Sequence, residues 1–139
     1  AEEVGATAAP ADVTDGGQVA AAVSAARQAN GAIDILINNA GAAESGPFAK
    51  LDMESWRRAI AINLDALFVT TQAALSDLLA SPAGRVVVVA STAGLKGYGY
   101  TAPYVAAKHG AIGFVRALAA EFARTNLTVN AVCPGFTET

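Results

Sequence analysis

Hydrophobic residues follow two alternating patterns along the chain. Short apolar runs with β-branched residues predict buried strands over residues 33–38, 85–91 and 128–132, and a first strand is expected over residues 7–13. Between these runs, apolar residues recur at steps of three and four, which predicts helices over residues 15–30, 52–80 and 102–124. Short strand–helix–strand crossovers are right-handed and give a parallel sheet. The pattern therefore predicts an α/β fold with a doubly wound parallel sheet.

One amide side chain falls on the apolar face of the helix predicted over residues 52–80. Asp52 is a suitable N-cap for this helix. The apolar stripe then passes through Trp56, Ile60, Leu64, Leu67, Phe68, Thr71, Leu75 and Leu78. Asn63 lies on the same stripe, where an amide costs about 1–3 kcal/mol unless it finds hydrogen-bond partners. Asn63 is therefore either a satisfied core amide or a functional group.

Chemistry is expected at the carboxyl ends of the predicted strands, because ligands bind there in sheets of this type. The residues at these ends are Asp12-Val13, Asn38-Asn39-Ala40-Gly41, Ser91 and Pro134-Gly135. Ser91 could donate its hydroxyl proton to a substrate oxygen, although it also fits an ordinary turn.

Tyr104 and Lys108 lie four residues apart on the helix predicted over residues 102–124, so both side chains project from one face. A phenol has a reference pKa of about 10, and an adjacent ammonium lowers it by favouring the phenolate. The pair is therefore a candidate general acid/base. The same spacing also occurs in exposed helix pairs, so a catalytic role requires that Ser91 and Asn63 reach the same site as Tyr104 and Lys108.

Composition narrows the classes of function. A chain of 139 residues has room for one domain. The net charge of −3, without runs of like charge, disfavours nucleic-acid and anionic-membrane partners. Charged residues make up 15% of the chain, below the roughly 25% of an average domain, so we expect part of the surface to be covered by an oligomer or a missing segment.

Neither a metal site nor a membrane span is predicted. Cys133 is the only cysteine and His109 the only histidine, so no cluster of metal ligands or disulfide framework is expected. Polar residues such as Asn63 and Asp65 interrupt the longest apolar stretches. We expect a protein of a reducing compartment, the cytoplasm.

A series of motifs resembles the classical short-chain dehydrogenases/reductases across essentially the whole chain. In order, these motifs are Asp12-Val13, NNAG at 38–41, INL at 62–64, ASTAG at 90–94, YVAAK at 104–108 and VNAVCPGFTET at 129–139. The resemblance implies a Rossmann-type fold and a catalytic tetrad of Asn63, Ser91, Tyr104 and Lys108. Ser91 would polarise a carbonyl, Tyr104 would exchange a proton, Lys108 would lower the tyrosine pKa, and Asn63 would hold a relay water.

The resemblance also implies a nicotinamide cofactor and a small-molecule carbonyl or alcohol substrate. The residues implied to contact the cofactor are Asp12, Val13, Asn39, Ala40, Gly41, Tyr104, Lys108, Pro134, Gly135, Thr137 and Thr139. NAD and NADP cannot be distinguished, because the family's discriminating residues lie in a phosphate loop and a strand that the chain lacks.

Several parts of the family pattern are missing. The first βαβ unit with its glycine-rich phosphate loop and the last strand are absent, and GYGYTA at 97–102 is a poor substitute because it lies several residues past its strand. Residues 95–100 are interpreted instead as a loop beside the substrate. We therefore expect residues 1–139 to form a single incomplete Rossmann-fold domain, the central part of a longer chain.

Three functions remain open at this stage. The leading one is an NAD(P)-dependent oxidoreductase, most similar to ketoreductases of 3-oxoacyl thioesters and polyketides. The second is a truncated, catalytically silent chain that acts only as a structural or binding subunit. The third is the extended branch of epimerases and dehydratases, although the NNAG motif favours the classical branch.

The resemblance also implies a homodimer or homotetramer. Small residues occupy one row of the helix predicted over residues 102–124, at Ala106, Gly110, Gly113 and Ala117. Such a row allows a helix of a second subunit to approach closely, although the same residues could instead pack on their own sheet.

Overall fold

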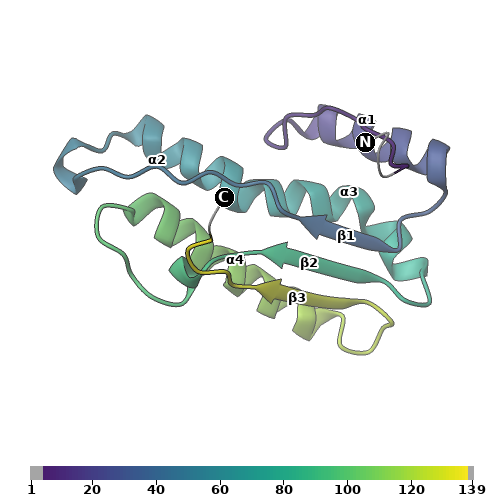
Figure 1. Ribbon diagram of the computed structural model, residues 1–139. Helices are drawn as coiled ribbons and strands as arrows, with labels where there is room; N and C mark the ends of the chain where they lie inside the picture. The colour runs from purple at the N-terminus through teal and green to yellow at the C-terminus, as the bar shows by residue number, and fades with distance from the viewer. Residues whose placement is uncertain (1–4, 138–139) are drawn as a thin grey trace.

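The computed structural model describes residues 5–137, and Figure 1 shows their arrangement. The elements in order are α1 (Gly16–Asn30), β1 (Ile35–Asn38), η2 (Phe48–Lys50), α2 (Met53–Ile60), η3 (Ala61–Asp65), α3 (Ala66–Ala80), β2 (Arg85–Val89), η4 (Thr92–Gly94), α4 (Ala102–Glu121) and β3 (Thr128–Val132). Here η2 and η4 are short 3-10 helices, whereas η3 is a π-helical turn between α2 and α3.

The three strands form one parallel sheet in the order β1-β2-β3. Ile37 of β1 lies opposite Val87 of β2, and Val87 lies opposite Asn130 of β3. These strands correspond to the runs predicted over residues 33–38, 85–91 and 128–132. The predicted parallel α/β sheet is therefore confirmed, as a partial Rossmann-type fold.

The described helices lie along one face of this sheet. In Figure 1, α3 and α4 lie behind the strands, and α1 packs beside α3. The buried core between them is apolar and consists of Leu67, Ala74, Leu78, Val86, Val88, Ala111, Val115, Leu127 and Val129. This packing fixes the strand ends relative to the start of α4.

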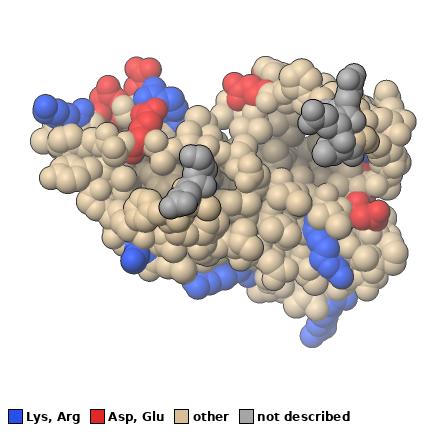
Figure 2. Space-filling model, viewed as in Figure 1, with Lys and Arg blue, Asp and Glu red and all other residues tan. Residues whose placement is uncertain are grey.

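The opposite face of the sheet carries exposed apolar side chains. Ile35 and Ile37 are 59% and 62% exposed, and Val132 is 48% exposed. Continuous apolar strands are typical of sheets covered on both faces, yet no described helix covers the face that carries Ile35 and Ile37. Figure 2, in the same view, shows charged side chains mostly toward the margins and a largely uncharged surface between them.

The strand predicted over residues 7–13 is wrong. Residues 6–12 have no assigned secondary structure, and a turn follows at Val13 and Thr14. A strand is stabilised by hydrogen bonds to a neighbouring strand, and this segment has no pairing partner among residues 5–137. Only Thr7 and Val13 of this segment are β-branched, and Pro10 has no N–H to donate to a neighbouring strand.

The helix boundaries agree closely with the predictions. The Asp15 carboxylate caps α1 by accepting from the main-chain N–H groups of Gly17 and Gln18, and Gly31 ends the helix with a φ of 86°. Asp52 caps α2 by accepting from the N–H of Ser55 at 2.8 Å. The last helix ends at Glu121, three residues before the predicted end at Arg124.

The stretch Met53–Ala80 is long and apolar enough, by length and composition alone, to cross a membrane. A single stretch that meets this criterion is weak evidence for a membrane span. In Met53–Ala80, the side chains of Asn63, Leu67 and Leu78 are buried within the domain. These residues lie on the side of the stretch that packs within the domain, whereas Met53 and Phe68 are 58% and 55% exposed.

Candidate active site

Ser91 lies just beyond the end of the central strand β2. It is the N-cap of η4, and its Oγ accepts a hydrogen bond from the N–H of Ala93 at 3.0 Å. Because the hydroxyl acts as an acceptor in this bond, its own proton remains available for a ligand oxygen. Ser91 is half-buried, so a ligand can reach it.

Tyr104 and Lys108 lie on successive turns at the start of α4, as their spacing predicted. The Lys108 Nζ atom is 5.6 Å from the centroid of the Tyr104 ring. Lys108 is only 4% exposed, and its ammonium donates to the carbonyl of Val89 at 2.9 Å. Burial lowers the pKa of Lys108 below its ordinary value, and two of its three N–H donors remain for other partners.

A cleft of about 370 Å³ brings Ser91 and Tyr104 together. The other residues that line it are Ala43, Thr92, Ala93, Tyr98, Gly99, Thr101, Gly135 and Phe136. Residues from the segment after β3 and from the loop before α4 therefore share this cleft. The expectation that residues 95–100 border the site agrees with the presence of Tyr98 and Gly99 in the lining.

Asn63 occupies the π-helical turn η3, and its side chain is fully engaged by protein atoms. Its Nδ2 donates to the carbonyls of Ala42 at 2.8 Å and Ala59 at 3.0 Å, while its Oδ1 accepts from the N–H of Ala42 at 3.2 Å. The side chain is therefore a satisfied core amide. Its position in a π turn is nevertheless typical of functional sites.

Gly41 lies where Asn63 and Lys108 converge. A methyl group in place of its hydrogen would lie 3.0 Å from Asn63 Oδ1 and 3.4 Å from Lys108 Nζ. Only glycine leaves this narrow space between the two side chains open. Gly41 follows β1, whereas Asn63 lies in η3 and Lys108 in α4, so the tertiary fold assembles this cluster.

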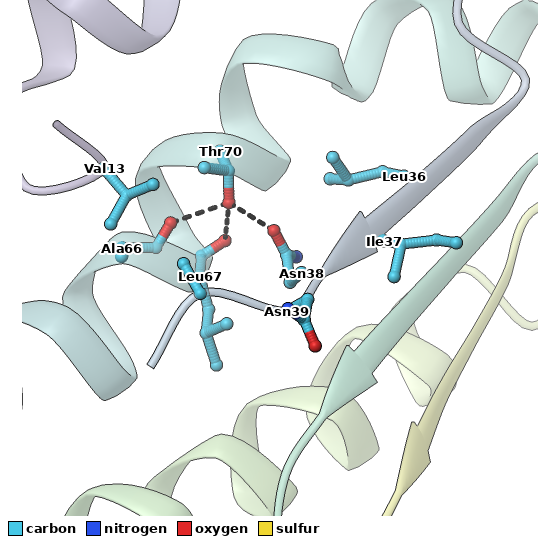
Figure 3. Close-up of a pocket in the computed structure, with 9 residues that line it drawn as sticks. Val13, Leu36, Ile37, Asn38, Asn39, Ala66, Leu67 and Thr70 are labelled. Carbon is cyan, nitrogen blue, oxygen red and sulfur yellow. Dashed lines mark hydrogen bonds between the residues drawn. The ribbon is translucent and has the colours of Figure 1, made fainter. Parts of the chain in front are cut away.

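A second, smaller cavity of about 120 Å³ lies at the carboxyl end of β1 (Figure 3). Val13, Asn39 and Ala40, which were predicted to contact a cofactor, line it. Thr70 also lines it, and its Oγ1 lies 2.7 Å from both Asn38 Oδ1 and the main-chain carbonyl oxygen of Ala66, either of which can accept its single hydroxyl proton (Figure 3). The sequence did not single out Thr70, because nothing local to the helix pairs it with Asn38.

Some of the remaining residues that were predicted to contact the cofactor lie at the larger cleft, and others do not. The Asp12 carboxylate accepts from the N–H and the hydroxyl of Thr14, which lowers its pKa, and Asp12 lines neither cavity described above. Pro134 accepts a hydrogen bond from the N–H of Thr92 at 2.9 Å, beside Gly135 in the larger cleft. Thr137 is exposed, and Thr139 lies outside the described residues.

No group of three or more His, Cys, Asp or Glu side chains within residues 5–137 is placed to hold a metal ion.

A family model and curated relatives both indicate the same family. The model of the short chain dehydrogenase family matches residues 1–139. Granaticin polyketide synthase putative ketoacyl reductase 1 of Streptomyces violaceoruber is 46% identical over 130 residues, which cover 92% of this chain and 48% of the relative. Acetoacetyl-CoA reductase of an Acinetobacter species is 44% identical over 119 residues, covering 86% of this chain and 48% of the relative.

A solved structure agrees with these relatives. The crystal structure of F189W actinorhodin polyketide ketoreductase with NADPH aligns with a TM-score of 0.89 and 42% identity, covering 92% of this chain and 50% of that one. The chain thus spans about half the length of the relatives that it matches.

Proposed function

Because the chain belongs to the short-chain dehydrogenase family, we propose that the protein is an NAD(P)-dependent oxidoreductase that interconverts a ketone and a secondary alcohol. The observation that carries this proposal is the cleft shared by the hydroxyls of Ser91 and Tyr104, with the Lys108 ammonium 5.6 Å from the Tyr104 ring. This arrangement supplies a carbonyl with a hydrogen-bond donor and a proton source.

In the reduction, Ser91 donates its free hydroxyl proton as a hydrogen bond to the ketone oxygen and polarises the carbonyl. Tyr104 transfers its phenolic proton to the same oxygen, which becomes the alcohol. The phenolate that forms is stabilised by the positive charge of Lys108. Solvent then returns a proton to Tyr104, and the oxidation runs through the same groups in reverse.

The residues present fit a nicotinamide cofactor. Gly41 leaves open a space that a methyl group would fill, next to the spare donors of Lys108. Asn39 and Ala40 continue from this space along the cavity at the end of β1. When bound, NAD or NADP supplies or accepts the hydride, while Lys108 and Gly41 would hold the ribose side and Gly135 would adjoin the nicotinamide side.

The substrate class that we propose is a 3-oxoacyl thioester. The relatives named ketoacyl reductase and acetoacetyl-CoA reductase, at 46% and 44% identity, support this choice. The test is reduction of acetoacetyl-CoA by the full-length protein, followed as oxidation of NADPH or NADH, with an aldose and a steroid ketone as competing substrates. Turnover confined to the sugar or the steroid would refute the thioester assignment.

We also propose that residues 1–139 form the central part of a longer Rossmann-fold domain. Two observations support this proposal. The sheet face that carries Ile35 and Ile37 is exposed, and the relative from Streptomyces violaceoruber is about twice as long as this chain. Helices contributed by further chain would cover that face, since a parallel sheet is normally buried on both sides. The intact mass of the polypeptide under denaturing conditions tests this directly, and a mass corresponding to 139 residues would contradict it.

A second subunit is proposed to pack on the outer faces of α3 and α4. A small apolar cavity of about 90 Å³ opens between these helices, lined by Phe68, Thr71, Gln72, Leu75, Phe114, Leu118 and Phe122. Gly113 on α4 has open space around it, as a helix–helix contact requires. Gly110 has a different role, because a methyl group there would lie 2.8 Å from Leu64 of the same chain.

A further inference from the structure

Two hydroxyl groups that the proposed reaction does not use lie in the same cleft as Ser91 and Tyr104. The Thr92 Oγ1 and Tyr98 OH atoms are 2.9 Å apart, and both residues line the cleft. Either atom can be the donor of this hydrogen bond. The hydroxyl that acts as the acceptor keeps its own proton, so the pair always retains one O–H group that can donate to a ligand.

The surroundings of this pair favour a neutral acceptor on the ligand. None of the described residues that line the cleft carries a charged side chain. The remaining hydroxyl nearby is already engaged, because Thr101 Oγ1 donates to the main-chain carbonyl of Tyr98 at 3.0 Å. A carbonyl oxygen is the neutral acceptor that fits one free O–H donor beside apolar walls.

Both members of the pair make further contacts within the chain. The N–H of Thr92 donates to the carbonyl of Pro134 at 2.9 Å. The Tyr98 ring contacts the edge of Phe136, with ring centroids 6.0 Å apart at an interplanar angle of 84°, and Lys96 Nζ lies 5.1 Å from its centroid.

The electrostatics of Tyr98 strengthen it as a donor. The hydrogen bond with Thr92 lowers the pKa of the Tyr98 phenol, and the ammonium of Lys96 lowers it further. A more acidic phenol donates a stronger hydrogen bond to a carbonyl oxygen.

We propose that the Thr92–Tyr98 hydroxyl pair binds the second carbonyl oxygen of a 1,3-dicarbonyl substrate whose ketone lies at Ser91 and Tyr104. Thr92 follows Ser91 directly in the chain and both residues line the same cleft. The two carbonyls of such a substrate are separated by one carbon, so one cleft offers donors to both. This inference rests on the proposed function and narrows its substrates to 3-oxo esters and thioesters. Tyr98 is then a specificity-determining residue.

The experiment compares two ketones of matched length in the full-length protein. Ethyl acetoacetate has the second carbonyl, and 2-heptanone replaces the ester group with methylenes. Tyr98→Phe combined with Thr92→Val removes both hydroxyls of the pair but keeps the Tyr98 ring position against Phe136, whereas either single variant would leave one O–H donor. We expect the kcat/KM of the double variant for ethyl acetoacetate, relative to that for 2-heptanone, to fall about tenfold, mainly through KM, as the loss of one hydrogen bond would produce.

Tyr100→Phe is the matched control, because Tyr100 is 70% exposed and does not line the cleft. Tyr100→Phe should leave the ratio of kcat/KM for ethyl acetoacetate to that for 2-heptanone unchanged. Equal losses of kcat/KM for both ketones in the double variant would indicate a purely structural role and overturn the inference. If that variant does not fold, Tyr98→Phe combined with Thr92→Ala replaces it, and an unchanged ratio there counts against the inference in the same way. If the unmodified protein reduces neither ketone, the proposed function itself fails.

Discussion

The ammonium of Lys108 is hydrogen-bonded to the main-chain carbonyl of Val89 at 2.9 Å. Val89 is the last residue of β2, and Ser91 follows it by two positions. The bond therefore ties the helix that carries Tyr104 to the strand end that presents Ser91. It also explains how a lysine that is only 4% exposed keeps its position next to the tyrosine ring.

Replacement of Lys108 by methionine should separate its chemical role from its structural one. Tyr104 loses the nearby positive charge, so we expect kcat to fall at least about 100-fold. The free energy of unfolding should change by less than about 1 kcal/mol, because loss of one hydrogen bond is offset by removal of a buried charge. Kinetics and thermal melts test both effects. Arg116→Met, at an exposed position on α4, is the control, and a Lys108→Met variant with wild-type kcat would contradict the role.

Gly41→Ala should disturb the site without touching the tyrosine. The added methyl group would lie 3.0 Å from Asn63 Oδ1 and 3.4 Å from Lys108 Nζ, so one of these side chains has to move. We expect a loss of about 1–3 kcal/mol in stability from overpacking, together with weaker cofactor binding measured by fluorescence titration. Gly97→Ala, with no neighbour within 4 Å of the new methyl, should change neither quantity. Unaltered cofactor affinity in Gly41→Ala would argue that this space is not part of the cofactor site.

The ion pair between α1 and α3 predicts a pH-dependent contribution to stability. Arg27 Nε donates to Asp77 Oδ2 at 2.6 Å, and the N–H of Ile33 donates to the same oxygen at 3.1 Å. These bonds lower the pKa of Asp77 below 3.8. Because the pKa of Asp77 is lower in the folded protein than in the unfolded chain, its ionisation stabilises the folded protein at any pH above the pKa of the unfolded state. This stabilisation is lost as the pH falls through the pKa of the folded state.

Asp77→Asn should therefore lower the melting temperature at neutral pH, and its difference from wild type should shrink as the pH falls below 3.8. Glu44→Gln is the control, because the Glu44–Arg58 pair is exposed and such pairs contribute little. A difference between Asp77→Asn and wild type that stays constant down to low pH would show that ionisation of Asp77 is not responsible.

Gly113→Phe should weaken the proposed dimer. A methyl group at Gly113 would have no neighbour within 4 Å in its own chain, so a large ring there is tolerated by the subunit but blocks a close helix contact. Sedimentation equilibrium should show a larger monomer fraction. Gly113→Ala is the matched control and should sediment like wild type. An unchanged sedimentation profile for Gly113→Phe would contradict a subunit contact at this position.

Local patterns predicted the parts of the fold that local chemistry determines. The apolar run at residues 85–91 became β2, and the spacing of Tyr104 and Lys108 placed both on one face of α4. The strand predicted over residues 7–13 failed because strand formation depends on a pairing partner that composition does not reveal. The π turn at Asn63 and the contact of Thr70 with Asn38 were missed because both depend on packing between distant segments.

The most direct test of the central claim is the kcat of Tyr104→Phe in the full-length protein, measured with acetoacetyl-CoA and reduced cofactor. Removal of the phenolic proton donor should lower kcat by at least about 100-fold, while the Kd for the cofactor stays within about threefold of wild type, a difference of less than about 1 kcal/mol. Turnover close to wild type would contradict the assignment of Tyr104 as the acid/base.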